Sequence, residues 1–269
     1  MTRLFLITLM LALPFARAHA QFDHQHKAWG ELLKKHVVLI DGGKASQVRY
    51  AELARDRAAL TAYLASLSRV SEAEFKSWGK EQQLAFLINA YNAHMVELIL
   101  TRYPNIKSVW DFGKFFNNPF KNKFFTLFGR AFSLDNIEHD TIRAKGVYDD
   151  PRIHFAVSCA SIGCPKLRDE AYVADRLDQQ LENQVVQFLS DRSRNRYDAE
   201  RNALEVSEIF KWYAEDFSSG LKSINSREQF FAAYASLLAD HSEHQKLIRG
   251  QKVDIRFFGY HWGLNDAKR

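Results

Sequence analysis

The stretch DPRIHFAVSCASIGCPKLRDEAY, residues 150–172, carries the clearest strand pattern in the chain and both of its cysteines. Residues 153–159 form an apolar, β-rich run, and the two-residue period of a strand places His154 and Cys159 on opposite faces. Small residues, a glycine and a proline follow in residues 160–165. The sequence therefore predicts a buried strand that ends at Cys159 and enters a tight turn.

Three interpretations of the two cysteines stay open. Backbone amides in a turn lower the pKa of a thiol and hold an oxyanion, so Cys159 is a candidate nucleophile. The amino-terminal residues, described below, indicate export, and an exported protein with two cysteines suggests a disulfide between them. Such a Cys159–Cys164 bridge requires the two Cα atoms to come within about 7 Å. The third interpretation is a pair of inert, buried thiols.

Helical patterns dominate the rest of the chain. We expect helices over residues 50–67, 81–103, 171–189, 207–217 and 226–239, hairpins over residues 123–134 and 197–206, and a last strand over residues 253–258. The strands are too scattered for a repeated βαβ pattern. The sequence predicts an α+β fold, a mostly helical single domain with a small antiparallel sheet.

The first twenty residues are typical of a secretory signal. A short cationic start, MTR, precedes a mostly apolar run over residues 4–15, and Ala18-His19-Ala20 matches a small-x-small cleavage site. The apolar run is shorter than the roughly 20 residues that cross a bilayer, so we expect no stable membrane span after signal removal. Cleavage after Ala20 predicts a periplasmic or secreted protein whose globular domain is residues 21–269.

Charge and motifs exclude several classes of function. Removing residues 1–20 takes away Arg3 and Arg17 and no acidic residue, so the net charge falls from +5 to +3, which gives no reason to expect nucleic acid as a partner. The chain has no phosphate-binding loop, dinucleotide fingerprint, nucleophile elbow or HExxH motif, and no cofactor is predicted. His24 and His26 are expected in a solvated tail rather than in a metal site. The expected partner is a small molecule or a peptide, and the oligomeric state stays open.

Two asparagines stand out in the longest predicted helix. The segment AFLINAYNA, residues 85–93, is apolar nearly all round, so Asn89 and Asn92 are expected inside the protein. Buried amides need hydrogen-bond partners, and the i, i+3 spacing puts both near one face. They either hold a neighbouring turn or bind a ligand or an imidazole.

The segment SLDNIEHDTIR, residues 133–143, places three titratable residues in a short helix. Asp135 is expected to cap this helix, with Glu138 as its capping-box partner. His139 has no such role. It is either a general base, because imidazole titrates near neutral pH, or a histidine at the surface or at the edge of the core.

These segments resemble, in order, the blocks of the domain of unknown function 547 family. The blocks are FLINAYNA, SLDNIEH with Arg143, DPRIHFAVSCAS with Cys164-Pro165, SEIFKWYAEDF and YHWGLN, which together cover about residues 80–265. The resemblance implies a fold similar to papain-like cysteine peptidases and a thiol-centred site. It points to Cys159 with Cys164, His139 with Glu138, and Asn89. Papain-like enzymes order these residue types Cys, His, Asn, whereas here the asparagine and the histidine precede the cysteine.

The leading hypothesis is a periplasmic thiol-dependent hydrolase or transferase that acts on a peptide-like or glutathione-like small substrate. Cys159 attacks a carbonyl, His139 moves the proton, Glu138 orients the imidazole, and backbone amides after Cys159 hold the oxyanion. The remaining candidates are Cys164, His154 as a reserve base, and Asn89, Asn92 and Arg143 as substrate-binding residues. The alternatives are a non-catalytic periplasmic binding or structural module with a Cys159–Cys164 disulfide, and a metal site of histidine, cysteine and carboxylate ligands.

Overall fold

A computed structural model describes residues 21–114, 116–218 and 220–267. The expected signal peptide lies outside the described residues. The helices are α1 (Lys27–His36), α2 (Tyr50–Leu53), α3 (Arg57–Ser68), α4 (Glu72–Ser77), α5 (Lys80–Leu100), α6 (Leu134–Ile137), α7 (Leu177–Leu189), α8 (Ile209–Trp212), α9 (Arg227–Ala233), α10 (Ala235–Leu238) and α11 (Ser242–Arg249). The strands are β1 (Val37–Ile40), β2 (Ala45–Val48), β3 (Phe125–Leu127), β4 (Arg130–Phe132), β5 (Arg196–Asp198), β6 (Ala203–Ser207) and β7 (Asp254–Phe258). The fold is α+β and mostly helical, as the sequence predicts.

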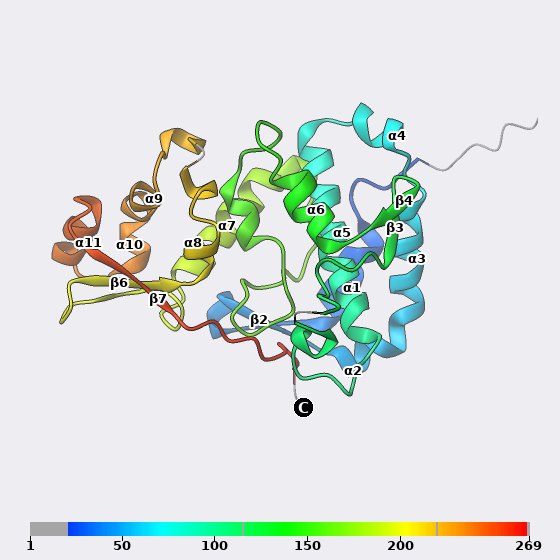
Figure 1. Ribbon diagram of the computed structural model, residues 1–269, viewed down its shortest axis with the longest axis horizontal. Helices are drawn as coiled ribbons and strands as arrows, with labels where there is room; N and C mark the ends of the chain where they lie inside the picture. Colours follow the sequence, from blue (N-terminus) through cyan, green and yellow to red (C-terminus); the bar gives the residue numbers. More distant parts are fainter. Residues whose placement is uncertain (1–20, 115, 219, 268–269) are drawn as a thin grey trace, which may run out of the picture.

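The long helix α5 forms the centre of the larger part of the molecule. Its sequence is apolar nearly all round, and it is buried along most of its length between α1, α3, α6 and the β3–β4 hairpin (Figure 1). The helix ends at Leu100, shortly before Pro104, which cannot continue it.

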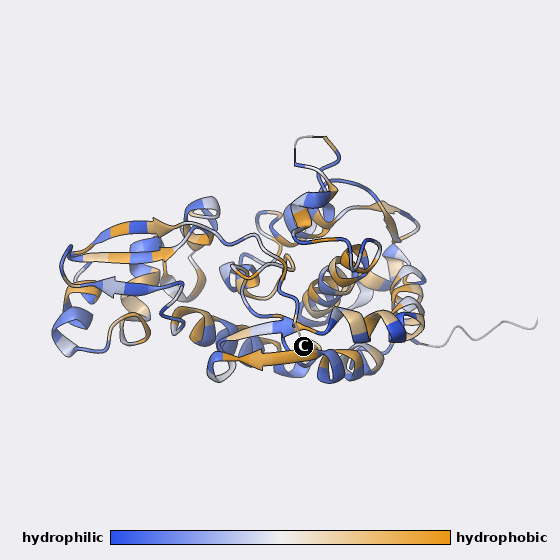
Figure 2. Ribbon diagram, turned by 90° about the horizontal axis from the view of Figure 1, so that it is seen from below, coloured by the Kyte–Doolittle hydropathy of each residue, from blue (hydrophilic) through white to orange (hydrophobic). Residues whose placement is uncertain are grey.

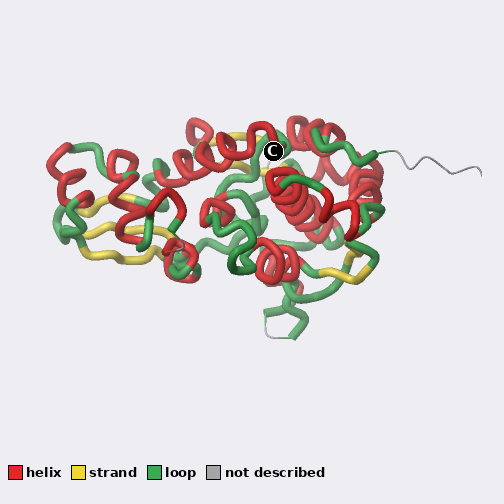
Figure 3. The backbone as a smooth tube through the Cα atoms, turned by 90° about the horizontal axis from the view of Figure 1, so that it is seen from above, coloured by secondary structure: helices red, strands yellow, loops and turns green. Residues whose placement is uncertain are grey.

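Helix α7 joins two hydrophobic clusters. Its first turns contribute Leu177 and Leu181 to the cluster around α5. Its last turns contribute Val185 and Phe188 to a second cluster with α8 to α11 and the β5–β7 sheet. Figure 1 shows this second group at one end of the molecule, and Figure 2 shows apolar residues in the elements of both ends. Figure 3 shows that loops, rather than helices or strands, fill much of the space between the two ends.

The strands form three small sheets. The β1–β2 and β3–β4 hairpins are antiparallel, and in the third sheet β6 pairs with β5 antiparallel and with β7 parallel. The predicted hairpins over residues 123–134 and 197–206 are confirmed. The first turns at Phe128 and Gly129, both at positive φ, and the second turns beside Asn202 at φ 46°.

The predicted strand over residues 153–159 is wrong. Residues Pro151–Phe155 form a 3₁₀ turn instead, because Asp150 accepts the N–H of Arg152 as an N-cap and Pro151 occupies the first helical position. The segment then runs on as a loop. Its backbone groups find partners on α5 rather than on a neighbouring strand, which explains how an apolar run is buried here without a sheet.

Several predicted helix limits also need correction. Helix α7 begins at Leu177 rather than near residue 171, and the helices predicted over residues 207–217 and 226–239 are each broken into shorter pieces. Ser133, not Asp135, caps α6, because its hydroxyl accepts the N–H of Asn136. His26 lies outside any solvated tail: it is 2% exposed and bonded to the Tyr63 hydroxyl at 2.7 Å.

Candidate active site around Cys159

An aromatic cavity of about 400 Å³ lies beside Cys159. Its aromatic lining includes Tyr91, Trp110, Phe120, Trp212, Tyr213 and Trp262. Its polar and titratable lining includes Glu138, His139, Arg143, His154, Cys159, Cys164 and Tyr260. A largely apolar wall with a few convergent polar groups is typical of a small-molecule site.

Two groups of interacting side chains border this cavity. The sulfur cluster consists of Cys159, Ser161, Cys164 and Tyr260. The charged cluster consists of Glu138, His139, Arg143, His154 and Asp216.

Two buried asparagines of α5 hold the segment that carries the cysteines. Asn92 donates to the carbonyl of Ala156 at 2.9 Å and accepts the N–H of Ser158 at 2.8 Å. Asn89 binds both backbone groups of Tyr172 in the same way, at 2.7 and 3.0 Å. Both asparagines are at most 2% exposed. Both amides hold backbone turns, which is the first of the roles that the sequence leaves open for them.

The C-terminal segment binds the loop between the two cysteines. The N–H of Ile162 donates to the carbonyl of Gly263, and the N–H of Gly163 to that of His261, each at 2.8 Å. A Cβ atom at Gly163 would lie 2.9 Å from the backbone nitrogen of His261, so this approach requires glycine. The amides of Ile162 and Gly163 are therefore engaged by the C-terminal segment, whereas the backbone N–H of Ser161 helps to lower the pKa of Cys159.

The Cys159 sulfur has three neutral side-chain partners. It lies 2.9 Å from the sulfur of Cys164, 3.0 Å from the Ser161 hydroxyl and 3.2 Å from the Tyr260 hydroxyl. Both cysteines are free thiols in the structure. Cys159 is half-buried at the cavity wall, whereas Cys164 is 5% exposed.

These partners give the two thiols opposite acidities. Burial alone would raise the pKa of Cys159, but hydrogen bonds from Cys164, Ser161 and Tyr260 lower this pKa to about 7. Burial and the contact with Cys159 raise the pKa of Cys164 well above its usual range. A substantial fraction of Cys159 is therefore thiolate at neutral pH.

His154 is held by an ionised carboxylate. Its Nε2 lies 2.7 Å from Asp216, and Arg143 donates to the same carboxylate at 2.5 and 3.1 Å. Burial would raise the pKa of Asp216, but hydrogen bonds from His154 and Arg143 hold it well below its usual range. The imidazole also stacks on Tyr213, with ring centroids 3.7 Å apart.

The other ring nitrogen of His154 is a free acceptor. Because Nε2 donates to Asp216, a neutral His154 carries its lone pair on Nδ1. This buried Nδ1 has no hydrogen-bond partner among the described residues, and an oxygen of Glu138 lies 3.8 Å from it. Burial lowers the pKa of His154 in spite of the neighbouring carboxylates, so the imidazole is neutral at pH 7.

His139, the base predicted from the sequence, has charged partners on both ring nitrogens. Arg143 donates to its Nδ1, and its Nε2 lies 3.7 Å from Asp135. Glu138 lies beside His154 rather than orienting His139. Both Glu138 and His139 belong to a π-helical turn, Glu138–Ile142, a local geometry that is frequent at functional sites.

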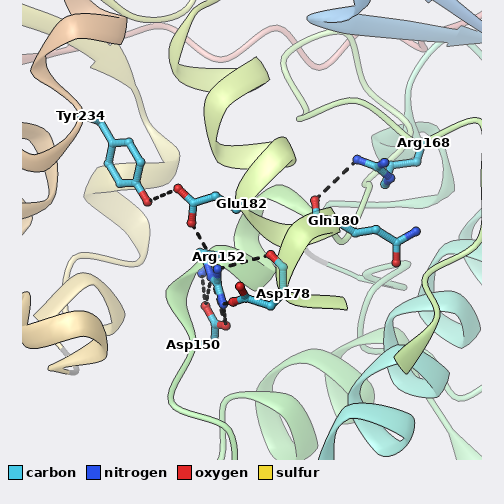
Figure 4. Close-up of polar contacts among 7 residues, drawn as sticks. All are labelled: Asp150, Arg152, Arg168, Asp178, Gln180, Glu182 and Tyr234. Carbon is cyan, nitrogen blue, oxygen red and sulfur yellow. Dashed lines mark hydrogen bonds and ion pairs between the residues drawn. The ribbon is translucent and has the colours of Figure 1, made fainter. Parts of the chain in front are cut away.

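A buried arginine fixes the turn that carries His154. Arg152 is 5% exposed and binds Asp150, Asp178 of α7 and Glu182 of α7 at 2.8, 2.7 and 3.2 Å (Figure 4). Tyr234 of the second hydrophobic cluster donates to Glu182 at 2.7 Å (Figure 4). This network connects the 3₁₀ turn to α7, so we expect it to position His154 without contacting the cavity.

Six of the eight predicted site residues line one cavity: Glu138, His139, Arg143, His154, Cys159 and Cys164. Neither imidazole is a hydrogen-bond partner of Cys159 within the part of the chain that the structure describes. Sequence reasoning missed Asp216, Tyr213 and Tyr260. The sequence marked these residues only by placing them in the blocks SEIFKWYAEDF and YHWGLN, to which no chemistry is assigned.

The described residues contain neither a metal cluster nor a membrane-spanning helix. Within residues 21–114, 116–218 and 220–267, no group of three or more histidine, cysteine or acidic side chains is arranged to hold a metal ion. In that same part of the chain, no helix combines the length and the apolar character needed to cross a bilayer.

The comparison with protein families gives one match. The model of the family described as "Protein of unknown function, DUF547" matches residues 75–189. Residues 75–189 therefore carry a domain of this family. The matched region includes both asparagines, the π-helical turn and both cysteines of this family member, whereas Asp216 and Tyr260 lie beyond it. No curated protein and no solved structure matches the chain, so the papain-like fold stays an expectation.

Proposed function

We propose that the protein is a thiol-dependent hydrolase or transferase that acts on a small peptide-like or glutathione-like substrate. The observation that carries this proposal is the free Cys159, which has a pKa of about 7 and faces a cavity of about 400 Å³. A thiolate at neutral pH is a strong nucleophile, and a cavity of this size admits a small molecule or a short peptide.

The proposed reaction begins with attack of the Cys159 thiolate on a carbonyl carbon of the substrate. A tetrahedral oxyanion forms, and we assign the hydroxyls of Tyr260 and Ser161, which already lie beside the sulfur, as donors for it. Collapse of this intermediate breaks the bond to the leaving group, which departs as a thiolate or as an amine that takes its proton from solvent, and leaves an acyl-cysteine. Water completes a hydrolysis, and an amine or thiol acceptor completes a transfer.

We assign the base to His154 rather than to His139. His154 presents a free Nδ1 while Asp216 holds its other nitrogen, which is the arrangement that a general base requires. In the second step it would take the proton from the attacking water or acceptor. His139, with its Nδ1 bonded to Arg143, would contribute to the wall of the substrate site.

Acyl transfer to Cys159 is the step to test. The reduced full chain is mixed with peptide and γ-glutamyl thioesters, and the intact mass and the released thiol are followed. We expect an acyl adduct on Cys159 that Cys159→Ala abolishes, and release that His154→Asn slows more than the matched control His241→Asn, since His241 is exposed. An unacylated wild type, or turnover that survives in Cys159→Ala, would overturn the proposal.

Export is a separate part of the proposal. The signal-like pattern of residues 1–20 supports cleavage after Ala20 and a periplasmic or secreted location. Amino-terminal sequencing of the protein recovered from a periplasmic fraction should begin at Gln21. Recovery of the intact chain from the cytosol would contradict export.

The sulfur contact also favours a second candidate, a non-catalytic module with a permanent Cys159–Cys164 disulfide. The sulfurs are already 2.9 Å apart, so an oxidising compartment could join them. Thiol counting on protein purified without reductant separates the two candidates. Two titratable thiols favour the enzyme, and a disulfide whose reduction yields no reactive thiol favours the module.

A further inference from the structure

We propose that Cys159 and Cys164 form a thiol–disulfide exchange pair, in which Cys159 attacks the disulfide of a small molecule and Cys164 resolves the product. This activity goes beyond acyl transfer and uses the same nucleophilic Cys159, the same cavity and the same neighbouring hydroxyls. The chain has two cysteines, and their sulfurs lie 2.9 Å apart. Joining them requires a movement of only about 1 Å.

The exposure of the two sulfurs matches an attacking and a resolving thiol. Cys159 is half-buried and lines the cavity, so a small disulfide can reach it. Cys164 is 5% exposed and lies directly beside Cys159. An incoming substrate therefore meets Cys159 first, and Cys164 reaches a sulfur only after that sulfur is attached to Cys159.

The acidities favour the same order of events. At rest the Cys159 thiolate is stabilised by hydroxyl donors, while burial and the contact with Cys159 keep Cys164 protonated. Once Cys159 is in a mixed disulfide, its negative charge is gone and one cause of the raised Cys164 pKa disappears. The N–H of Cys159, which donates to the Cys164 sulfur at 2.9 Å, then stabilises the second thiolate.

The exchange balances in two steps. The Cys159 thiolate attacks one sulfur of R–S–S–R′, forming a Cys159–S–S–R bond, breaking the substrate S–S bond and releasing R′–S⁻. Cys164 loses its proton to the solvent and attacks the Cys159 sulfur, releasing R–S⁻. One substrate disulfide is reduced to two thiols, and the protein dithiol is oxidised to a Cys159–Cys164 disulfide.

The cavity selects a small disulfide. A volume of about 400 Å³ with aromatic walls admits a disulfide of a low-molecular-weight thiol, such as a short peptide thiol, rather than a loop of a folded protein. The hydroxyls of Ser161 and Tyr260 lie where a leaving thiolate forms and can stabilise it.

The experiment uses the reduced full chain and oxidised glutathione, with acid quenching and intact-mass measurement. We expect the wild type to lose two hydrogen atoms and to release two glutathione molecules per chain. We expect Cys164→Ser to accumulate a one-to-one mixed disulfide with glutathione on Cys159, and Cys159→Ser to react at least tenfold more slowly. Thermal unfolding of each variant establishes that it is folded.

A persistent glutathione adduct on the wild type would overturn the proposal, since it would mean that Cys164 does not resolve it. A Cys159→Ser variant that reacts as fast as the wild type would overturn it as well. Thioester acylation of the reduced wild type is measured in parallel. Acylation without internal disulfide formation would contradict only the proposed exchange. Loss of both reactions would contradict the claim that Cys159 is a nucleophile, on which both proposals depend.

Discussion

The sulfur cluster and the charged cluster border the same cavity but are built in opposite ways. Around Cys159 the described partners of the sulfur are neutral donors: a thiol and two hydroxyls. Around His154 the partners are ionised, with Asp216 shared between the imidazole and Arg143. The difference shows that the thiol gains its acidity without an imidazolium, while the imidazole is kept neutral and oriented.

This division differs from a cysteine–histidine ion pair. In such a pair the imidazolium stabilises the thiolate, so the two groups titrate together. Here the low pKa of Cys159 originates within its own loop and its contact with Tyr260, and the pKa of His154 is lowered by its burial. We therefore expect changes in one cluster to affect different measurements from changes in the other.

The largest expected effect comes from the charged cluster. Asp216→Asn removes the carboxylate that orients His154 and neutralises Arg143, so we expect thioester turnover to fall by about 10²-fold or more. Steady-state kinetics checks this, with Asp240→Asn as the matched control because Asp240 forms an ion pair with Arg192 at the surface. Unchanged turnover would show that His154 is not the base.

A second effect concerns the support that carries the sulfur cluster. Asn92→Ala leaves the carbonyl of Ala156 and the N–H of Ser158 without their partner, and we expect the free energy of unfolding to fall by roughly 2–4 kcal/mol. Denaturant unfolding measures this loss. The matched control is Asn225→Ala at a position away from the core, which should change stability by less than about 1 kcal/mol. Equal losses in both variants would contradict the role given to Asn92.

Local patterns allowed much of the helical framework to be predicted. The apolar helix α5, the Phe-rich hairpin and the cap at Ser226 all follow from short-range periodicity and turn chemistry. The strand over residues 153–159 was predicted from its apolar run, but Asp150 and Pro151 start a 3₁₀ turn and Asn92 supplies the missing backbone partner. Backbone groups that are hydrogen-bonded by a side chain from a distant helix leave no local pattern in the sequence.

The candidate site was predicted in part for the same reason. Both cysteines and the two histidines were identified from their residue types and neighbours. Their roles could not be predicted in this way. The contact that favours His154 as the base is its hydrogen bond to Asp216, which lies 62 residues further along the chain. Tyr260, 101 residues from Cys159, reaches the sulfur through the C-terminal segment. Spacing along the sequence carries no information on contacts of this range.

The smallest expected effect isolates one donor of the sulfur cluster. Tyr260→Phe removes a hydroxyl that lowers the pKa of Cys159, so we expect this pKa to rise by roughly one unit. The pH dependence of thiol alkylation measures it. Tyr197→Phe is the matched control, because the Tyr197 hydroxyl bonds only with Asn202 among its described partners. An equal pKa in wild type and Tyr260→Phe would remove Tyr260 from the set of donors that acidify the thiol.

The pH dependence of iodoacetamide alkylation at Cys159, followed by peptide mass spectrometry on the reduced wild-type chain, tests the central claim most directly. The thiolate is the reactive form, so the rate rises with pH through the pKa of Cys159 and then levels off. A midpoint near pH 7 is the predicted result. A midpoint at or above pH 9, the ordinary value for a thiol, would contradict the claim that neutral donors acidify Cys159.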